Sequence, residues 1–86
     1  MTWQAIREQY PAQWLLLEVL EAESVQDVRH LKNLAVLERF DDLMTALRSY
    51  RSLKQSQPSR ELLVLHTNRL EPTILERHYV GIRGVA

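Results

Sequence analysis

An uninterrupted apolar run follows the turn at Pro11 and predicts a β-strand from Trp14 to about Ala22. Alternate side chains of a strand point to opposite faces of the sheet. Both faces of this strand are apolar, and their residues are Leu15, Leu17 and Val19 on one side and Trp14, Leu16 and Leu20 on the other. A strand of this kind has to be covered on both faces. The pattern therefore predicts a central strand that lies between two layers.

The residues before this run predict a short helix. Thr2 is a suitable N-cap, and Trp3, Ile6 and Tyr10 have helical spacing. The proline that follows Tyr10 disfavours helical backbone at the residue before it. We therefore expect a helix over residues 3–9.

A second apolar segment predicts a strand that begins at Leu31 or Lys32 and ends at Phe40. Its alternation predicts one face made of Leu34, Val36 and Phe40. The stretch between the two strands, residues 23–30, is polar and has no strong periodicity. It predicts a long hairpin connection.

Asp41 or Asp42 predicts the N-cap of a longer helix that continues to about Gln55. The apolar stripe of this helix consists of Leu43, Ala46, Leu47, Tyr50 and Leu53. A third apolar run predicts a strand over residues 61–67, and loose alternation predicts a fourth, edge strand over residues 73–80. Residues 81–86 contain two glycines and are expected to form a frayed tail.

These elements predict one α+β domain over residues 1–86 in the order α-β-β-α-β-β. The first two strands are expected to form an antiparallel hairpin. A right-handed helical crossover makes the second and third strands parallel, so the sheet of three or four strands is predicted to be mixed. The one long helix is expected to pack on one of its faces.

The short N-terminal helix is expected to be too small to cover the other face alone. Either the C-terminal tail shares this work, or a second copy of the chain or another protein covers the face. Because large exposed apolar patches are rare on monomers, the second alternative is favoured. The expected interface residues are Trp3, Tyr10, Trp14, Leu16 and Leu20. Aromatic residues are common at the centres of such interfaces.

Composition narrows the functional classes. Eleven basic residues balance eleven acidic ones, so net charge gives no reason to expect binding to nucleic acid or to an anionic membrane. The chain has no cysteine, no signal-peptide pattern and no apolar run of transmembrane length, and we expect a soluble cytoplasmic protein. No motif indicates a cofactor, and the three histidines lack metal-ligand spacing.

His66, Thr67 and Asn68 form a polar group at the end of the third strand. Strand ends often bear ligands in sheets with helical crossovers, so this group is a candidate binding or acid–base site. The alternative is that these residues shape the turn after the strand. Glu18 interrupts an apolar face, which predicts either a buried acid with a raised pKa or a partner of Arg39 on the next strand.

The motif Tyr10-Pro11-x-Gln13-Trp14 with the following aliphatic run, and again Leu65-His66-Thr67, resembles a group of short bacterial proteins without an assigned function. The resemblance covers most of the chain and implies a compact sheet-and-helix domain. Some members accompany genes for small retropepsin-like aspartic proteases, which implies such a protein as a partner. The chain lacks the Asp-Thr/Ser-Gly motif of those proteases, and the resemblance transfers no catalytic residue.

Three functions remain open from the sequence. The first is a non-enzymatic protein-interaction module that forms a homodimer or binds another protein. The second is a small ligand-binding protein or enzyme with a polar pocket near His66. The third is an antitoxin-like nucleic-acid-binding regulator that uses Arg48, Arg51 and Lys54 on the long helix.

Overall fold

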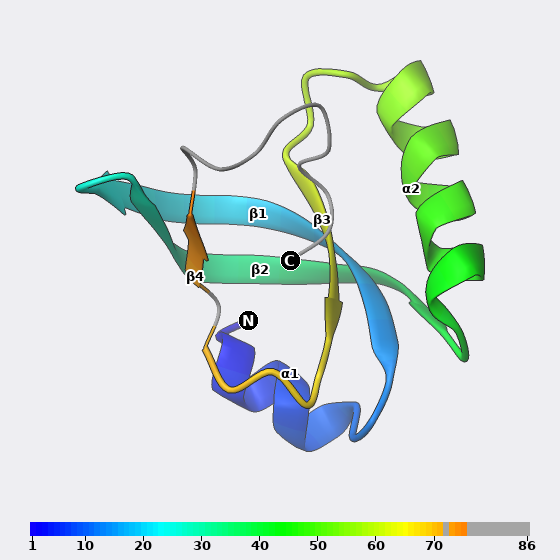
Figure 1. Cartoon of the computed structure of the whole chain (residues 1–86), viewed down its shortest axis with the longest axis horizontal. Helices are drawn as coiled ribbons and strands as arrows, with labels where there is room; N and C mark the ends of the chain where they lie inside the picture. The colour runs from blue at the N-terminus through cyan, green and yellow to red at the C-terminus, as the bar shows by residue number, and fades with distance from the viewer. Residues whose placement is uncertain (72, 76–86) are drawn as a thin grey trace.

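The computed structural model describes residues 1–71 and 73–75 and confirms an α+β fold. Along the chain, the elements are α1 (Trp3–Gln9), β1 (Trp14–Val25), β2 (Val28–Phe40), α2 (Leu43–Ser56), β3 (Leu62–His66) and β4 (Thr73–Leu75). The four strands form one sheet in the order β3-β1-β2-β4 (Figure 1). The predicted frayed tail, 81–86, and the second part of the predicted fourth strand, 76–80, lie outside the described residues.

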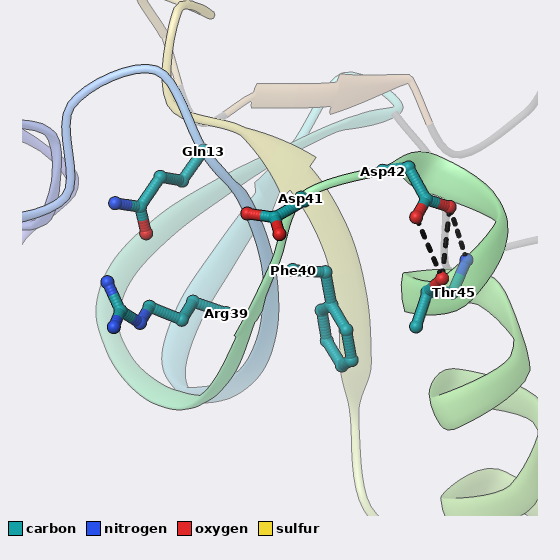
Figure 2. A pocket seen from close by; sticks show the side chains of 6 residues that line it. All are labelled: Gln13, Arg39, Phe40, Asp41, Asp42 and Thr45. Carbon is teal, nitrogen blue, oxygen red and sulfur yellow. Dashed lines mark hydrogen bonds between the residues drawn. The ribbon is translucent and has the colours of Figure 1, made fainter.

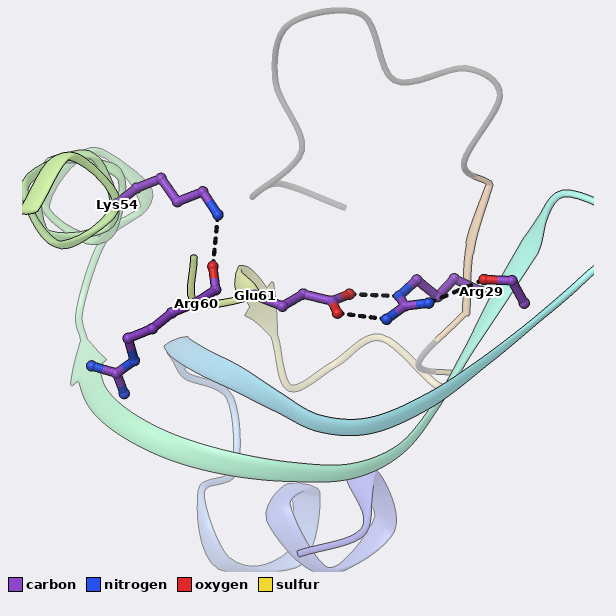
Figure 3. Close-up of polar contacts among 5 residues, drawn as sticks. Arg29, Lys54, Arg60 and Glu61 are labelled. Atoms are coloured by element: carbon purple, nitrogen blue, oxygen red, sulfur yellow. Dashed lines mark hydrogen bonds and ion pairs between the residues drawn. The ribbon is translucent and has the colours of Figure 1, made fainter. Parts of the chain in front are cut away.

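The two helices lie on opposite faces of the sheet (Figure 3). The buried residues of the α1-side cluster are Trp3, Ile6, Leu15, Leu17, Leu31, Leu34, Leu63 and Leu65. The α2-side cluster buries Leu16, Ala46, Leu62 and Val64, with partly buried Trp14, Phe40, Leu43, Leu47, Tyr50 and Leu53 around them. The predicted two-sided burial of the central strand is therefore confirmed.

On the face opposite the long helix, α1 inserts Trp3, which is 4% exposed, and Ile6, which is fully buried. An indole ring covers more area than an aliphatic side chain, so even a helix of seven residues covers a large part of this small sheet. The expected additional cover by a second chain stays a prediction. A hydrogen bond from the Leu34 amide to the Met1 carbonyl, at 2.8 Å, fixes the start of α1 beside β2.

The predicted mixed sheet was also wrong, because every strand pair is antiparallel. β3 pairs with β1 and not with β2, so β1 lies between β2 and β3. Its two apolar faces explain that position, since an inner strand is buried on both sides. The connection through α2 consequently passes over β1 instead of joining neighbouring strands.

The predicted long connection at residues 23–30 is a tight hairpin instead. β1 continues to Val25 and β2 begins at Val28, so only Gln26 and Asp27 form the turn. Both have positive φ angles, 51° and 67°, which is the conformation of a type I′ turn. Such turns usually contain glycine or asparagine, and the sequence Gln-Asp gave no signal for one.

A β-bulge in β2 changes the face to which Phe40 belongs. Leu16 pairs with Glu38 whereas Leu17 pairs with Val36, so Leu37 is the extra residue. One extra residue shifts the alternation by one position. Leu34 and Val36 therefore pack on the α1 side and Phe40 on the α2 side, contrary to the single face expected for all three.

Two consecutive residues before β3 connect that strand to both strands of the hairpin. Arg60 donates two hydrogen bonds to the Glu18 carboxylate on β1, at 3.0 and 2.5 Å. Glu61 accepts two from Arg29 on β2, both at 2.5 Å (Figure 3). The Lys54 ammonium of α2 donates to the Arg60 carbonyl at 2.6 Å. We call these two consecutive residues the Arg60–Glu61 pair. Their contacts connect the start of β3 to β1, β2 and α2.

Glu18 pairs with Arg60, so the expectation that it pairs with Arg39 was wrong. The pKa of Glu18 is lowered from 4.5, chiefly by the hydrogen bonds from Arg60, so the expected raised pKa was wrong as well. A carboxylate whose pKa is lower in the folded chain stabilises the fold above the unfolded pKa. That stabilisation is lost as the pH falls through the lowered folded value.

We predict that Glu18→Gln reduces the free energy of unfolding at pH 7, because the ion pair with Arg60 is lost. The difference from the wild type should shrink as the pH falls from 4.5 through the lowered folded pKa, below which the folded wild-type carboxylate is also neutral. Urea unfolding at a series of pH values measures it. A Glu8→Gln variant, changed at an exposed position of α1, is the matched control. An unchanged difference at acid pH would contradict the ion-pair explanation.

We also predict that Ile6→Ala lowers the free energy of unfolding by about 3 kcal/mol, because it leaves a cavity beneath α1. Met44→Ala, at a side chain that is 56% exposed, should lower it by less than about 0.5 kcal/mol. Chemical denaturation of both variants gives the two values. Equal small effects would mean that α1 does not cover the sheet.

Candidate functional site

A groove opens between α1 and β2 on the α1 side of the sheet, with a volume of about 420 Å³. We call it the α1–β2 groove. Its lining residues are Thr2, Trp3, Gln4, Arg7, Leu31, Lys32 and Leu70. The first four belong to α1 and its cap, the next two to β2, and the last to the loop after β3.

Helix α1 holds the loop after β3 in place. The Trp3 indole Nε1 donates to the Arg69 carbonyl at 2.8 Å, and Arg7 Nε donates to the Thr67 carbonyl at 2.7 Å. Leu70 follows directly, and its side chain is 73% exposed. The groove therefore has an anchored backbone beside an aliphatic side chain that remains in water.

The charge of the groove is positive. Arg7 and Lys32 are its two ionisable residues, and no carboxylate is among the lining residues. Neither cation forms an ion pair within residues 1–71 and 73–75. Apolar surface from Trp3, Leu31 and Leu70 lies between them. The groove can accordingly accept a segment that carries both aliphatic and acidic side chains.

The residues predicted as an interface are mostly covered by the chain itself. Leu16 is 2% exposed beneath α2, and Trp3 is 4% exposed at the groove. Tyr10 and Trp14 are partly buried against the α1-side and α2-side clusters, respectively. Leu20 alone of the five is exposed, because a register shift between Val19 and Glu21 takes it out of both clusters. Only Trp3 of the five lines the groove.

The polar group at the end of β3 connects β3 to β1. The Thr67 hydroxyl accepts from the Gln13 amide at 2.9 Å, and the Thr67 amide donates to the Gln13 carbonyl at 2.9 Å. His66 Nδ1 accepts from the Asn68 amide at 3.1 Å. Its ring meets Trp14 edge-on, with centroids 4.9 Å apart and planes at 82°. Thr67 is 2% exposed, and none of the three residues lines the groove. These contacts give the group a structural role.

The predicted basic strip on α2 is interrupted in the structure. Lys54 is half-buried, and its ammonium is used by the Arg60 carbonyl. Arg48 and Arg51 are exposed. Two exposed arginines on one helix are a small surface for phosphate contacts.

The described residues contain no cluster of three or more His, Asp or Glu that could hold a metal ion. In the same part of the chain, no helix is both long and apolar enough to cross a membrane. No protein-family model matches the chain, and neither a curated protein nor a solved structure matches it significantly. The resemblance to the short bacterial proteins stays a prediction.

Sequence reasoning missed most of the groove. Arg7, Lys32 and Leu70 lie in three separate segments, and no spacing rule connects them. One signal was present, because Leu70 is a lone aliphatic residue in the polar turn Asn68-Arg69-Leu70-Glu71. Single exposed apolar residues are common on protein surfaces, so this signal alone does not indicate a contact surface.

We predict that His66→Ala lowers the free energy of unfolding by about 1 kcal/mol, because it removes the ring contact with Trp14 and an acceptor for the Asn68 amide. Asn68→Ala keeps that backbone amide and should change stability by less than about 0.5 kcal/mol. Urea denaturation compares the two variants. If His66→Ala were as stable as the wild type, the ring would not be structural, and a binding role for His66 would again have to be tested.

Proposed function

We propose that the protein is a non-enzymatic protein-interaction module whose binding surface is the α1–β2 groove. The observation that carries this proposal is the exposure of Leu70, the most exposed large hydrophobic side chain in the described part of the chain. Its backbone is fixed by hydrogen bonds from α1 to the preceding residues, so little conformational freedom is lost on binding. Trp3 and Arg7, which line the groove beside it, are of residue types enriched at the centres of interfaces.

The chemistry of the groove defines its partner. Arg7 and Lys32 favour acidic side chains, and Leu70 and Trp3 favour aliphatic ones. A segment that alternates acidic and aliphatic residues satisfies both requirements.

A second copy of the chain carries such a segment. The outer part of the β1–β2 hairpin extends past the residues that pair with β3 (Figure 1). It exposes two carboxylates, Glu21 and Glu23, and two aliphatic side chains, Leu20 at 57% and Val25 at 45%. The zero net charge of the chain does not oppose self-association. We therefore propose a homodimer in which the hairpin of each copy contacts the groove of the other, a reciprocal arrangement with two-fold symmetry.

A small aspartic-protease-like protein remains a further possible partner, implied by the resemblance alone. The ligand-binding or enzymatic alternative near His66 and the nucleic-acid alternative on α2 receive no support from the contacts described above. The groove is the better-supported surface because its exposed apolar residue lies beside two cations that form no ion pair within the described residues.

We predict that Lys32→Glu, and separately the double variant Glu21→Lys/Glu23→Lys, weaken the dimer at least about tenfold, because like charges then face each other. An equimolar mixture of the two should recover dimer formation, since each mixed interface again joins opposite charges. Sedimentation velocity over a concentration series measures the dissociation constants. Arg51→Glu, an equal charge change on an exposed face of α2, is the matched control.

A wild-type protein that stays monomeric at about 100 µM would exclude the second copy as partner. The groove itself is then tested with the acetylated, amidated peptide Glu-Leu-Glu-Leu-Glu. Binding that Lys32→Glu removes would retain the interaction module with a different acidic partner. No dimer and no peptide binding would overturn the proposal.

A further inference from the structure

A second pocket lies on the molecule where β2 ends and α2 begins, and it is separate from the α1–β2 groove. Its volume is about 410 Å³. The residues that line it are Gln13, Arg39, Phe40, Asp41, Asp42 and Thr45 (Figure 2). The two sites share no lining residue.

Three of the six lining residues, Phe40, Asp42 and Thr45, already make contacts that stabilise the fold. The Asp42 carboxylate accepts from the Thr45 amide at 2.9 Å and from the Thr45 hydroxyl at 2.9 and 3.1 Å, which caps α2. Phe40 packs against the α2-side cluster. The amino end of α2 is consequently satisfied by its own cap and is not the basis of a site.

The side chains of the other three, Gln13, Arg39 and Asp41, make no hydrogen bond within the described residues. Gln13 Oε1 is buried and has no hydrogen-bond partner. Arg39 and Asp41 carry opposite charges, yet neither forms a hydrogen bond or ion pair within residues 1–71 and 73–75. Figure 2 shows Gln13, Arg39 and Asp41 extending to the same side, away from Phe40 and Thr45. A buried amide oxygen without a partner is rare in folded proteins and indicates a missing donor.

We propose that this pocket binds a small zwitterion of the α-amino acid class. The ligand carboxylate pairs with the Arg39 guanidinium, whose fork of donors matches the two oxygens. The ligand ammonium pairs with Asp41 and donates to Gln13 Oε1, which supplies the missing donor. The pocket volume lies in the range of small-molecule sites, and its largely polar lining suits a charged ligand.

The opposite charges distinguish this ligand class from simpler ones. A carboxylate alone would contact Arg39 and leave Gln13 Oε1 without a donor, and an amine alone would not use Arg39. A molecule that carries both groups can contact all three side chains. The inference does not depend on the dimer proposed above, because none of its residues lines the groove.

The test is a ¹H–¹⁵N NMR titration of the full chain with glycine and L-leucine, with propionate and ethylammonium as single-charge probes. Saturable shifts at residues 39–41 are expected for both amino acids, with binding at least about tenfold weaker for each single-charge probe. Arg39→Gln and Asp41→Asn should each weaken amino-acid binding about tenfold. Arg51→Gln, at an exposed position of α2 outside the pocket, is the matched control.

Gln13→Leu separates a binding role from a structural one. It should weaken amino-acid binding, while stability stays unchanged or rises, because a buried oxygen without a partner is removed. The backbone bonds of Gln13 to Thr67 do not involve the side chain and remain. The proposal is overturned if neither amino acid shifts the pocket resonances at about 10 mM, or if Arg39→Gln and Asp41→Asn bind as the wild type does.

Discussion

The structure depends on the burial of β1 on both of its faces. Leu15 and Leu17 are fully buried on the α1 side, and Leu16 is 2% exposed on the α2 side. A small domain buries a modest share of its surface, so one strand that contributes to two clusters uses its residues economically. This constraint determines the remaining architecture. β1 has to take an inner position, each face needs a helix, and β3 has to pair with it to complete both layers.

Polar contacts determine how the surrounding elements are placed on this strand. The Arg60–Glu61 pair connects β3 to the hairpin, and the Lys54 ammonium of α2 donates to the Arg60 carbonyl. On the α1 side, Trp3 and Arg7 hold the loop after β3 through its carbonyl groups. Trp3 and Arg7 also line the α1–β2 groove. The groove therefore exists because α1 is fixed at both the strand and the loop.

Local patterns predicted the elements well, and their arrangement poorly. The cap at Thr2, the short helix after it and the cap at Asp42 are confirmed, because capping and periodicity are properties of neighbouring residues. The pairing register of the strands could not be predicted from neighbouring residues. A Gln26-Asp27 turn without glycine, and a bulge at Leu37, reflect tertiary packing that overrides local preference. The groove was missed for the same reason, since its residues meet only in the folded chain.

The same bulge bears on how the chain can associate. Beyond the residues paired with β4 and Met1, no described strand pairs with the outer edge of β2 over residues 35–40. That edge carries the bulge at Leu37 and the charged residues Glu38 and Arg39, features that prevent a further strand from pairing with it. Association through this sheet edge is consequently disfavoured. Side-chain contacts remain, and the α1–β2 groove offers an anchored aliphatic residue between two cations. This is why we place the interface at the groove.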